Sequence, residues 1–324
     1  MMRQLLRRLV AGVVTVALVA LIGFVLLELT PGGPGSITED PRLGPEDRER
    51  VRAALGLDRS AGERLLAYAA SVIQGDLGLS LSRHQPVSKV LARALPPTLL
   101  LSGAALLVAL SLGLLIGTLA ALRPRSPLAW LARFVLPALD AVPPFWLGIC
   151  GVLVFAWQLG WLPAAHMASA HPVDGAWAVL ADRLRHLALP VLVLALPGAA
   201  PVARHHWASM RTALHSEHVR AARAAGLSER RVVWCRALPT ALLPTAQLIG
   251  LGLPALVGGA VVVEVVFSWP GLCRAHQQAL LARDVPLFLG GLILMGALVV
   301  AGGLLADLLS AWLDPRLRRA RSGL

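Results

Sequence analysis

The feature that most constrains the fold is a series of six apolar blocks, each long enough to cross a membrane. About 20 apolar residues in a helix span the hydrocarbon core of a bilayer. The sequence is 56% hydrophobic and only 15% charged, whereas an ordinary soluble domain is about 25% charged. We therefore predict an all-α polytopic membrane protein with six transmembrane helices, over residues 9–29, 98–122, 134–159, 187–207, 240–268 and 285–313.

The first block is expected to be a retained membrane helix rather than a cleaved secretory signal. The apolar core of a signal peptide is about 7–15 residues long and precedes a small-residue cleavage site. Residues 9–29 form a run of 21 residues that continues into Thr30-Pro31 without such a site. A run of this length predicts a helix that stays in the bilayer.

The distribution of arginines predicts the side of the membrane that each loop faces. Suppose that the termini and residues 123–133 and 204–236 lie in the cytoplasm. That side then carries 17 basic and three acidic residues, against 13 basic and 15 acidic residues elsewhere. Cytoplasmic loops are enriched in Lys and Arg, so both termini are expected in the cytoplasm. The net charge of +12 does not favour nucleic-acid binding, because the arginines flank apolar blocks instead of forming one face.

A long polar segment over residues 30–96 separates the first two blocks and is expected outside the cytoplasm. It contains nine basic and eight acidic residues, so it is nearly neutral. Two short amphipathic helices are predicted within it, near residues 45–56 and 62–74. The predicted organisation is thus an N-terminal helix over residues 1–29, this small outer segment, and a five-helix core over residues 97–324.

A polar, basic stretch over residues 215–239 interrupts the apolar sequence and reads HSEHVRAARAAGLSERRVVWCRALP. Its alanines favour a helix that starts after Ser216, and Gly226 suits a left-handed helix end. Ser228 can cap a second helix, which Pro239 is expected to limit. Small side chains let another surface approach the backbone closely. The pattern therefore predicts a docking element rather than a reaction centre.

The same stretch carries a resemblance to a known family. The spacing Arg220-Ala221-Ala222, then Gly226, then Arg236-x-Leu238-Pro239 resembles the EAA loop of importer-type ABC transporter permeases. Arg220 stands where many such families carry Glu, and Arg is usual there in the peptide/nickel branch. Further matches to that branch follow in order: LTPGGP (29–34), LGLD (55–58), GDLGLSL (75–81), LPPTL (95–99), FWLG (145–148), LGWLP (159–163), RHLALP (185–190), EVVFSWPGL (264–272) and DPR (314–316).

This resemblance to dipeptide, oligopeptide and nickel permeases implies the type I ABC importer fold in a bacterial inner membrane. It implies a translocation subunit for small peptides, nickel or metal chelates. The expected partners are a second homologous permease, two ABC ATPase subunits and an extracytoplasmic binding protein. The loop 204–239 is expected to dock the ATPase through Glu217, Arg220, Ala221, Ala222, Arg223, Gly226 and Leu227.

The chain itself is not expected to be an enzyme or to bind a cofactor. A Walker A motif needs Gly-Lys-Ser/Thr after a glycine-rich run. The one lysine, Lys89, follows Pro86-Val87-Ser88, so this motif is absent from the sequence. ATP and Mg²⁺ are accordingly expected on the partner ATPase subunits.

Several residues inside the apolar blocks are candidates for a translocation pathway. Ionisable groups in a membrane are costly and suggest a pathway or a buried pair. Asp140 is predicted to lie deepest, whereas Glu264 and Asp307 are expected to be exposed near the ends of their spans. Small residues in the fifth block favour either helix packing or the lining of a wide passage: Gly250, Gly252, Gly258 and Gly259. Gly113 and Gly117 form a GxxxG pattern that favours helix packing.

No metal site is predicted from the histidines or cysteines. His205, His206, His215 and His218 lack a spaced Cys or Glu partner, so they are expected to be surface residues of a basic loop. Cys150, Cys235 and Cys273 are widely separated and odd in number, which does not predict a disulfide framework.

Two other functions remain open at this point. A secondary transporter or channel would act without an ATPase, and an inverted repeat between the halves would favour it. An intramembrane enzyme is the weaker alternative, because the sequence has no GxSxG or HExxH motif.

Overall fold

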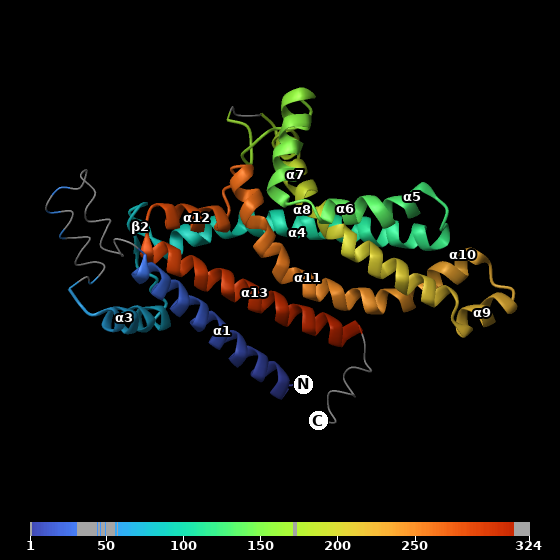
Figure 1. Ribbon diagram of the computed structural model, residues 1–324, viewed down its shortest axis with the longest axis horizontal. Helices are drawn as coiled ribbons and strands as arrows, with labels where there is room; N and C mark the ends of the chain where they lie inside the picture. Colours follow the sequence, from blue (N-terminus) through green and yellow to red (C-terminus); the bar gives the residue numbers. More distant parts are fainter. Residues whose placement is uncertain are drawn as a thin grey trace. The chain divides into compact units, whose positions relative to one another are not determined.

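The computed structural model describes residues 2–30, 58–170 and 174–313, with residues 44, 46, 49 and 56 between them. Within these ranges, side chains are described except at residues 2–5, 246–259, 307 and 309–313. The described chain is largely helical, with one short antiparallel strand pair (Figure 1). The predicted helix near residues 45–56 falls mostly outside the described residues.

The elements follow one another along the chain, and three of them are π-helical (η). In order they are α1 (Met2–Leu29), α3 (Ala61–Ile73), β1 (Leu79–Ser80), β2 (Gln85–Pro86), α4 (Val87–Leu122), α5 (Pro127–Trp130), η2 (Leu131–Val135), α6 (Leu136–Asp140), α7 (Pro144–Gly151), η3 (Val152–Gln158), α8 (Ala176–Leu214), α9 (Glu217–Ala224), α10 (Glu229–Val232), η4 (Val233–Ala237), α11 (Leu238–Val266), α12 (Leu272–Leu281) and α13 (Val285–Leu313).

Four helices in the described part of the chain are long and apolar enough to cross a membrane: Leu6–Leu29, Val87–Leu122, Ala176–Leu214 and Val285–Ala306. A fifth candidate is the bent pair Pro127–Asp140 and Pro144–Gln158. The remaining predicted span lies in α11, whose side chains over residues 246–259 are outside the described set. The membrane-spanning, helical character is therefore confirmed, and the number six stays a prediction.

The third predicted span, residues 134–159, is not one straight helix. The chain bends by 103° between α6 and α7. Pro143 and Pro144 cause the break, because neither has an N–H for a helical hydrogen bond and each disfavours helical geometry in the residue before it. Pro143 is extended at ψ 134°, and its carbonyl then accepts from the Trp146 N–H to start α7.

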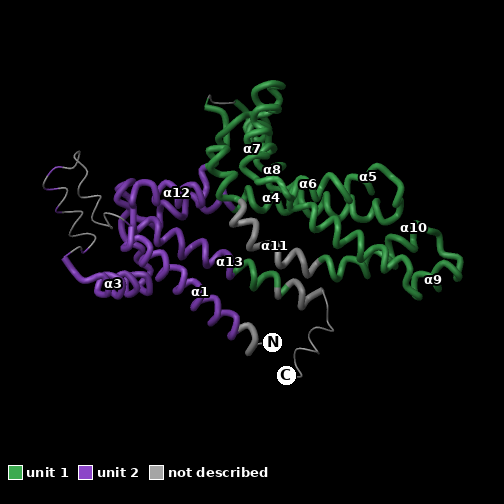
Figure 2. Tube along the Cα trace, in the orientation of Figure 1, with its two compact units in different colours: residues 1–5, 99–269, 301–324 green, residues 6–98, 270–300 purple. Residues whose placement is uncertain are grey.

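The chain divides into two compact units, shown in Figure 2, and each is described by itself. Unit 1 comprises residues 1–5, 99–269 and 301–324, and unit 2 comprises residues 6–98 and 270–300. The core of unit 1 is apolar and joins three long helices. It packs Leu101 and Ala105 of α4 and Leu189 of α8 against Phe267 and Trp269, which follow α11 directly.

Within unit 1, α4 lies directly against α8 at Gly113 and Gly117. A Cβ atom on Gly117 would lie 2.8 Å from the Ala203 carbonyl oxygen, and one on Gly113 would lie 2.6 Å from the Val202 side chain. These distances are shorter than van der Waals contact, so only glycine fits at this spacing. The packing role expected of the GxxxG pattern is confirmed for these two glycines.

In unit 2, α1 packs along α13, and a β-hairpin is fixed to the start of α13. The Asp284 carboxylate accepts hydrogen bonds from the Ser80 hydroxyl at 2.5 Å, the Ser82 hydroxyl at 2.7 Å and the Ser82 N–H at 2.9 Å. Its second oxygen accepts from the Leu287 N–H at 3.2 Å. Asp284 is fully buried, so this single carboxylate joins the hairpin formed by β1 and β2 to α13.

The predicted helix near residues 62–74 is confirmed as α3. It begins with a capping box, in which the Glu63 N–H donates to the Ser60 hydroxyl and the Ser60 N–H donates to the Glu63 carboxylate. The hydrogen bond from the Ser60 backbone lowers the pKa of Glu63. Arg64 forms an ion pair with Glu28, which fixes α3 to the end of α1.

The tight α4–α8 contact predicts a difference between two glycines of the same helix. Gly117→Ala should destabilise the protein by about 1–3 kcal/mol, because its methyl group would overlap the backbone of α8. Gly103→Ala is the matched control, since a Cβ there meets no atom within 4 Å, and it should be neutral or slightly stabilising. Thermal unfolding in detergent measures both. Equal midpoints for the two variants would contradict the close-contact account.

Candidate functional site

The predicted helix, glycine turn and second helix over residues 215–239 are present at the ends of α8 and α11 (Figure 1). Gly226 follows α9 with a left-handed φ of 81°, as the sequence predicts. The Leu227 N–H donates to the Ala222 carbonyl at 3.2 Å, and the Gly226 N–H donates to the Arg223 carbonyl at 3.0 Å. This pair of bonds is the Schellman motif, which satisfies the last carbonyls of the helix.

The N-terminal caps differ from the prediction. Ser216 and Ser228 occupy the N-cap positions of α9 and α10, but neither side chain bonds to its helix. The Ser216 hydroxyl donates instead to the Ala213 carbonyl at 2.5 Å, at the end of α8. Ser216 therefore stabilises the junction between α8 and α9.

The expectation that Pro239 limits the second helix is wrong. α10 continues through η4 into α11, and Pro239 lies at the start of that long helix. The π-helical segment explains how the helix accommodates it. The Leu238 N–H donates to the Val233 carbonyl five residues earlier, instead of four residues earlier as in an α-helix. The hydrogen-bond pattern has therefore already changed before Pro239, which has no N–H to donate. The segment over residues 215–239 therefore joins α11 without an intervening loop.

An apolar group that we call the α9 cluster holds the element to α8. Val219, Val232 and Ala237 are buried against Met210 and Ala213 of α8. Burying a valine side chain contributes about 1.5–3 kcal/mol, so this contact fixes the orientation of α9. The face of α9 that points away from α8 is consequently the one that a partner can reach.

The structure separates the candidate docking residues into two groups. Ala222 and Leu227 are half-buried and pack against the α9 cluster. Glu217, Arg220 and Ala221 are exposed, together with Ala224, Ala225 and Gly226. Positions 217, 220, 221 and 224 recur at helical spacing, so they lie on one face of α9. That face presents two small side chains, Ala221 and Ala224, beyond one acidic and one basic residue.

The two arginines of α9 are not equivalent. The Arg223 guanidinium donates to the Glu229 carboxylate at 2.7 Å and to the Leu214 carbonyl at 3.3 Å, which clamps the turn. The Arg220 guanidinium has no hydrogen bond or ion pair to any described side chain or backbone group. Arg220 is therefore the arginine of α9 that remains available for a partner.

The expectation that all four histidines lie on the surface is wrong for His206, which is fully buried in α8. The Thr245 hydroxyl donates to the Ala241 carbonyl at 3.0 Å, so it accepts from His206 Nδ1 at 3.1 Å. Nε2 of His206 then accepts from the Thr118 hydroxyl at 2.9 Å. His206 thus joins α4, α8 and α11. Among the described residues, no three His, Cys, Asp or Glu side chains are grouped as metal ligands.

The structure places two of the ionisable pathway candidates. Asp140 is exposed at the end of α6, directly before the bend, and its predicted depth in the membrane stays a prediction. Glu264 is fully buried rather than exposed, and the chain turns back at this point, since the Trp269 N–H donates to the Glu264 carbonyl at 2.8 Å. The side chain of Asp307 and the surroundings of four glycines lie outside the described set: Gly250, Gly252, Gly258 and Gly259.

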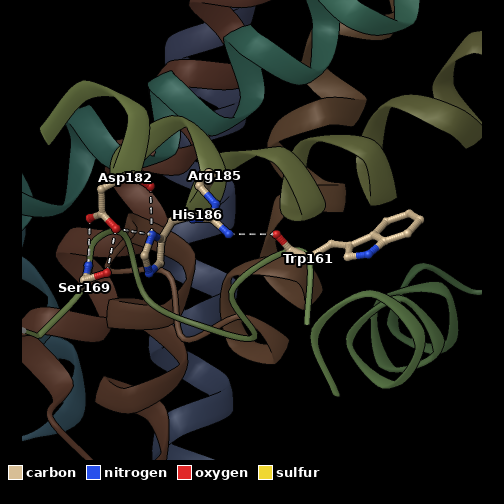
Figure 3. A network of polar contacts seen from close by, with 5 residues as sticks. All are labelled: Trp161, Ser169, Asp182, Arg185 and His186. Atoms are coloured by element: carbon tan, nitrogen blue, oxygen red, sulfur yellow. Dashed lines mark hydrogen bonds and ion pairs between the residues drawn. The ribbon is translucent and has the colours of Figure 1, made fainter. Parts of the chain in front are cut away.

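A polar network that the sequence does not predict joins the loop after η3 to the start of α8 (Figure 3). Asp182 accepts from the Ser169 hydroxyl at 2.6 Å and from the Ser169 N–H at 2.9 Å. Arg185 donates to the Trp161 carbonyl at 3.1 Å. The LGWLP and RHLALP motifs therefore touch each other. Their shared resemblance to one family was the only signal in the sequence that could have suggested it.

Comparison with known proteins gives matches over nearly the whole chain. Residues 113–319 match the family "Binding-protein-dependent transport system inner membrane component", and residues 1–102 match the corresponding N-terminal family. The oligopeptide transport system permease protein AppB of Bacillus subtilis is 33% identical over 318 residues, covering 98% of this chain and 99% of that protein. A putative peptide permease protein of Brucella suis is 38% identical over 323 residues, with the same shares covered.

Two further matches complete the comparison. The probable D,D-dipeptide transport system permease protein DdpB of Escherichia coli is 34% identical over 322 residues, covering 95% of each chain. A solved amino acid ABC transporter with bound histidines aligns with a TM-score of 0.49 and 18% identity, over 71% of this chain and 94% of that one. From the family matches and the full-length relatives, the chain belongs to the binding-protein-dependent transport system inner membrane components, the permease subunits of ABC importers.

Proposed function

We propose that this chain is one of two permease subunits that together form the passage of an ATP-driven importer for short peptides. The observation that carries this proposal is the full-length similarity to peptide permeases, whose names specify oligopeptides and D,D-dipeptides. These names favour peptides over nickel or metal chelates as the cargo. The remaining partners would be a second permease, two ATPase subunits and an extracytoplasmic binding protein.

The exposed face of α9 is the proposed contact with the ATPase. Ala221 and Ala224 carry only a methyl group each, so a groove on the partner can approach the helix backbone closely. Glu217 and Arg220 precede them on the same face and can form polar contacts. The Schellman turn and the Arg223–Glu229 pair hold this face in one conformation. A rigid, preorganised surface loses less conformational entropy on binding than a flexible loop does.

The proposed topology places both termini and α9 in the cytoplasm. The excess of arginine in the termini and in residues 123–133 and 204–236 supports it. The segment that contains α3 would then lie on the extracytoplasmic side, together with the β-hairpin and α12.

Cysteine labelling tests this topology. Cys235 is exposed, so the experiment starts from a variant in which all three native cysteines are alanine. Glu63→Cys and Ser228→Cys are then introduced singly at two exposed positions. The experiment uses a thiol reagent that reaches the outer face of the cytoplasmic membrane but cannot cross that membrane. In intact cells it should label Cys at position 63 and not at position 228. Labelling of position 228 from outside would contradict the proposed orientation.

Docking of the ATPase is tested with Ala221→Trp. The bulky ring would hold the partner away from α9, so uptake of labelled tri-alanine and co-purification of the ATPase should both fall about tenfold or more. Ala222→Trp is avoided, because Ala222 packs against the α9 cluster and a larger side chain there would disturb the fold. Ala70→Trp, on an exposed position of α3, is the matched control and should change neither quantity.

Both variants should accumulate in the membrane at the wild-type level, because neither residue is buried. If Ala221→Trp protein retains its ATPase and imports tri-alanine at the wild-type rate, α9 is not the docking site. If both variants lose transport equally, the effect is not specific to α9.

The chain alone is expected to hydrolyse no ATP, because its sequence contains no Gly-Lys-Ser/Thr motif. The measurement is phosphate release by the purified chain in lipid nanodiscs, with and without added ATPase subunits. Release should appear only when the subunits are added. Sustained release by the chain alone would favour an enzyme over a permease.

A further inference from the structure

Unit 2 contains a cavity of about 620 Å³ that the proposed function does not use. It lies between the β-hairpin, the first turns of α4 and the first turns of α12. Three arginines come from these three segments: Arg83 from the hairpin, Arg93 from α4 and Arg274 from α12. Residues separated by almost 200 positions in the sequence thus bring three positive charges to one cavity.

Arg83 and Arg93 are each positioned by a neutral acceptor. The Arg83 guanidinium donates to the Gln278 side-chain oxygen at 2.8 Å, and the Arg93 guanidinium donates to the Gln85 side-chain oxygen at 3.3 Å. Both acceptors are neutral amides. Among the described residues that line the cavity, none is acidic. An arginine has five N–H donors, so each of these two retains donors for a ligand.

The carboxylate that holds the hairpin to α13 is committed to the fold. Asp284 accepts hydrogen bonds from Ser80 and Ser82 and is fully buried. Its charge therefore stabilises the fold of the hairpin and is not presented to the cavity. An anion that enters the cavity would meet guanidinium groups without competition from an acidic side chain of the lining.

The walls of the cavity are apolar where the arginines are absent. Val90, Ala94 and Ala275 are buried residues of an apolar cluster that joins α4, α12 and α13 in unit 2. They form part of the lining, together with Pro270. An apolar wall under a cationic rim suits a ligand with an anionic group on an uncharged body. Arginine binds carboxylates with two parallel N–H···O bonds, which gives geometric specificity as well as affinity.

We propose that this cavity binds the free C-terminal carboxylate of a short peptide on the extracytoplasmic side. The proposal rests on the proposed peptide import and on the proposed topology, and it names a substrate group that this chain recognises directly. Arg83 and Arg93 hold the carboxylate, and the apolar wall accepts the adjoining uncharged residue. An inorganic anion has no such body and gains nothing from the wall.

The experiment compares two probes that differ only in the C-terminal charge. Acetyl-tri-alanine has one negative charge, and acetyl-tri-alanine amide has none. Binding of each radiolabelled probe to the full-length chain in phosphatidylcholine nanodiscs is measured by equilibrium dialysis. The free acid should bind about tenfold or more tightly than the amide, because only the acid offers a carboxylate to the guanidinium groups. Inorganic phosphate should displace it only at a concentration about tenfold higher than unlabelled acid does.

Substitutions assign the binding to this cavity. Arg83→Gln and Arg93→Gln should each weaken binding of the free acid about tenfold and leave binding of the amide unchanged. Lys89→Gln is the matched control, since it removes a positive charge from an exposed position of α4 outside the cavity lining, and it should change neither. Thermal unfolding of each variant verifies that it is folded. The two arginines are substituted in separate proteins. If one variant misfolds, the other still tests the proposal.

Five results would overturn the proposal. Four are no binding of the free acid, equal binding of the acid and the amide, unchanged binding in both arginine variants, and an equal loss in Lys89→Gln. Displacement by phosphate at the same concentration as by the acid would make the site a general oxyanion site, which also contradicts it. The binding measurement needs no ATPase. Its failure would therefore leave the Ala221→Trp test of the proposed function untouched, and failure of that test would not alter the dialysis result.

Discussion

The close contact between α4 and α8 is the interaction on which unit 1 depends. In a bilayer, apolar side chains gain little by leaving lipid for protein, so helices associate through close packing and hydrogen bonds. Gly113 and Gly117 provide the packing, since any Cβ there would overlap α8. His206 adds the hydrogen bonds, to Thr118 on α4 and to Thr245 on α11. These contacts hold α4, α8 and α11 together at neighbouring positions along the helices.

The position of α9, the proposed docking helix, follows from this arrangement. α8 runs on to Leu214 and supplies Met210 and Ala213 to the α9 cluster, so α9 is oriented by the same helix that α4 holds. On the other side of the glycine turn, α10 continues through η4 into α11 without a loop. A force applied to α9 by a partner would therefore act on two long helices directly, as the proposed docking of an ATPase at α9 requires.

Arginine acts in three physically different ways in this chain. Arg223 neutralises Glu229 and clamps a turn, whereas Arg220 is exposed on the face proposed for a partner. Arg83 and Arg93 line a cavity and donate to glutamine oxygens, so these hydrogen bonds leave their charge without a carboxylate partner. A net charge of +12 would not distinguish these roles. The identity of each acceptor distinguishes them, because a carboxylate neutralises a guanidinium and an amide only orients it.

The sequence by itself determined the helical membrane class, the family and the glycine turn of α9, because block length, motif order and the backbone freedom of Gly226 are local properties. The number of six spans remains a prediction. Only the tertiary structure decided the burial of His206 and Glu264, the exposure of Asp140 and the grouping of Arg83, Arg93 and Arg274. Burial depends on which segments pack over a residue, and these segments are far apart in the sequence, so no local pattern records their contact.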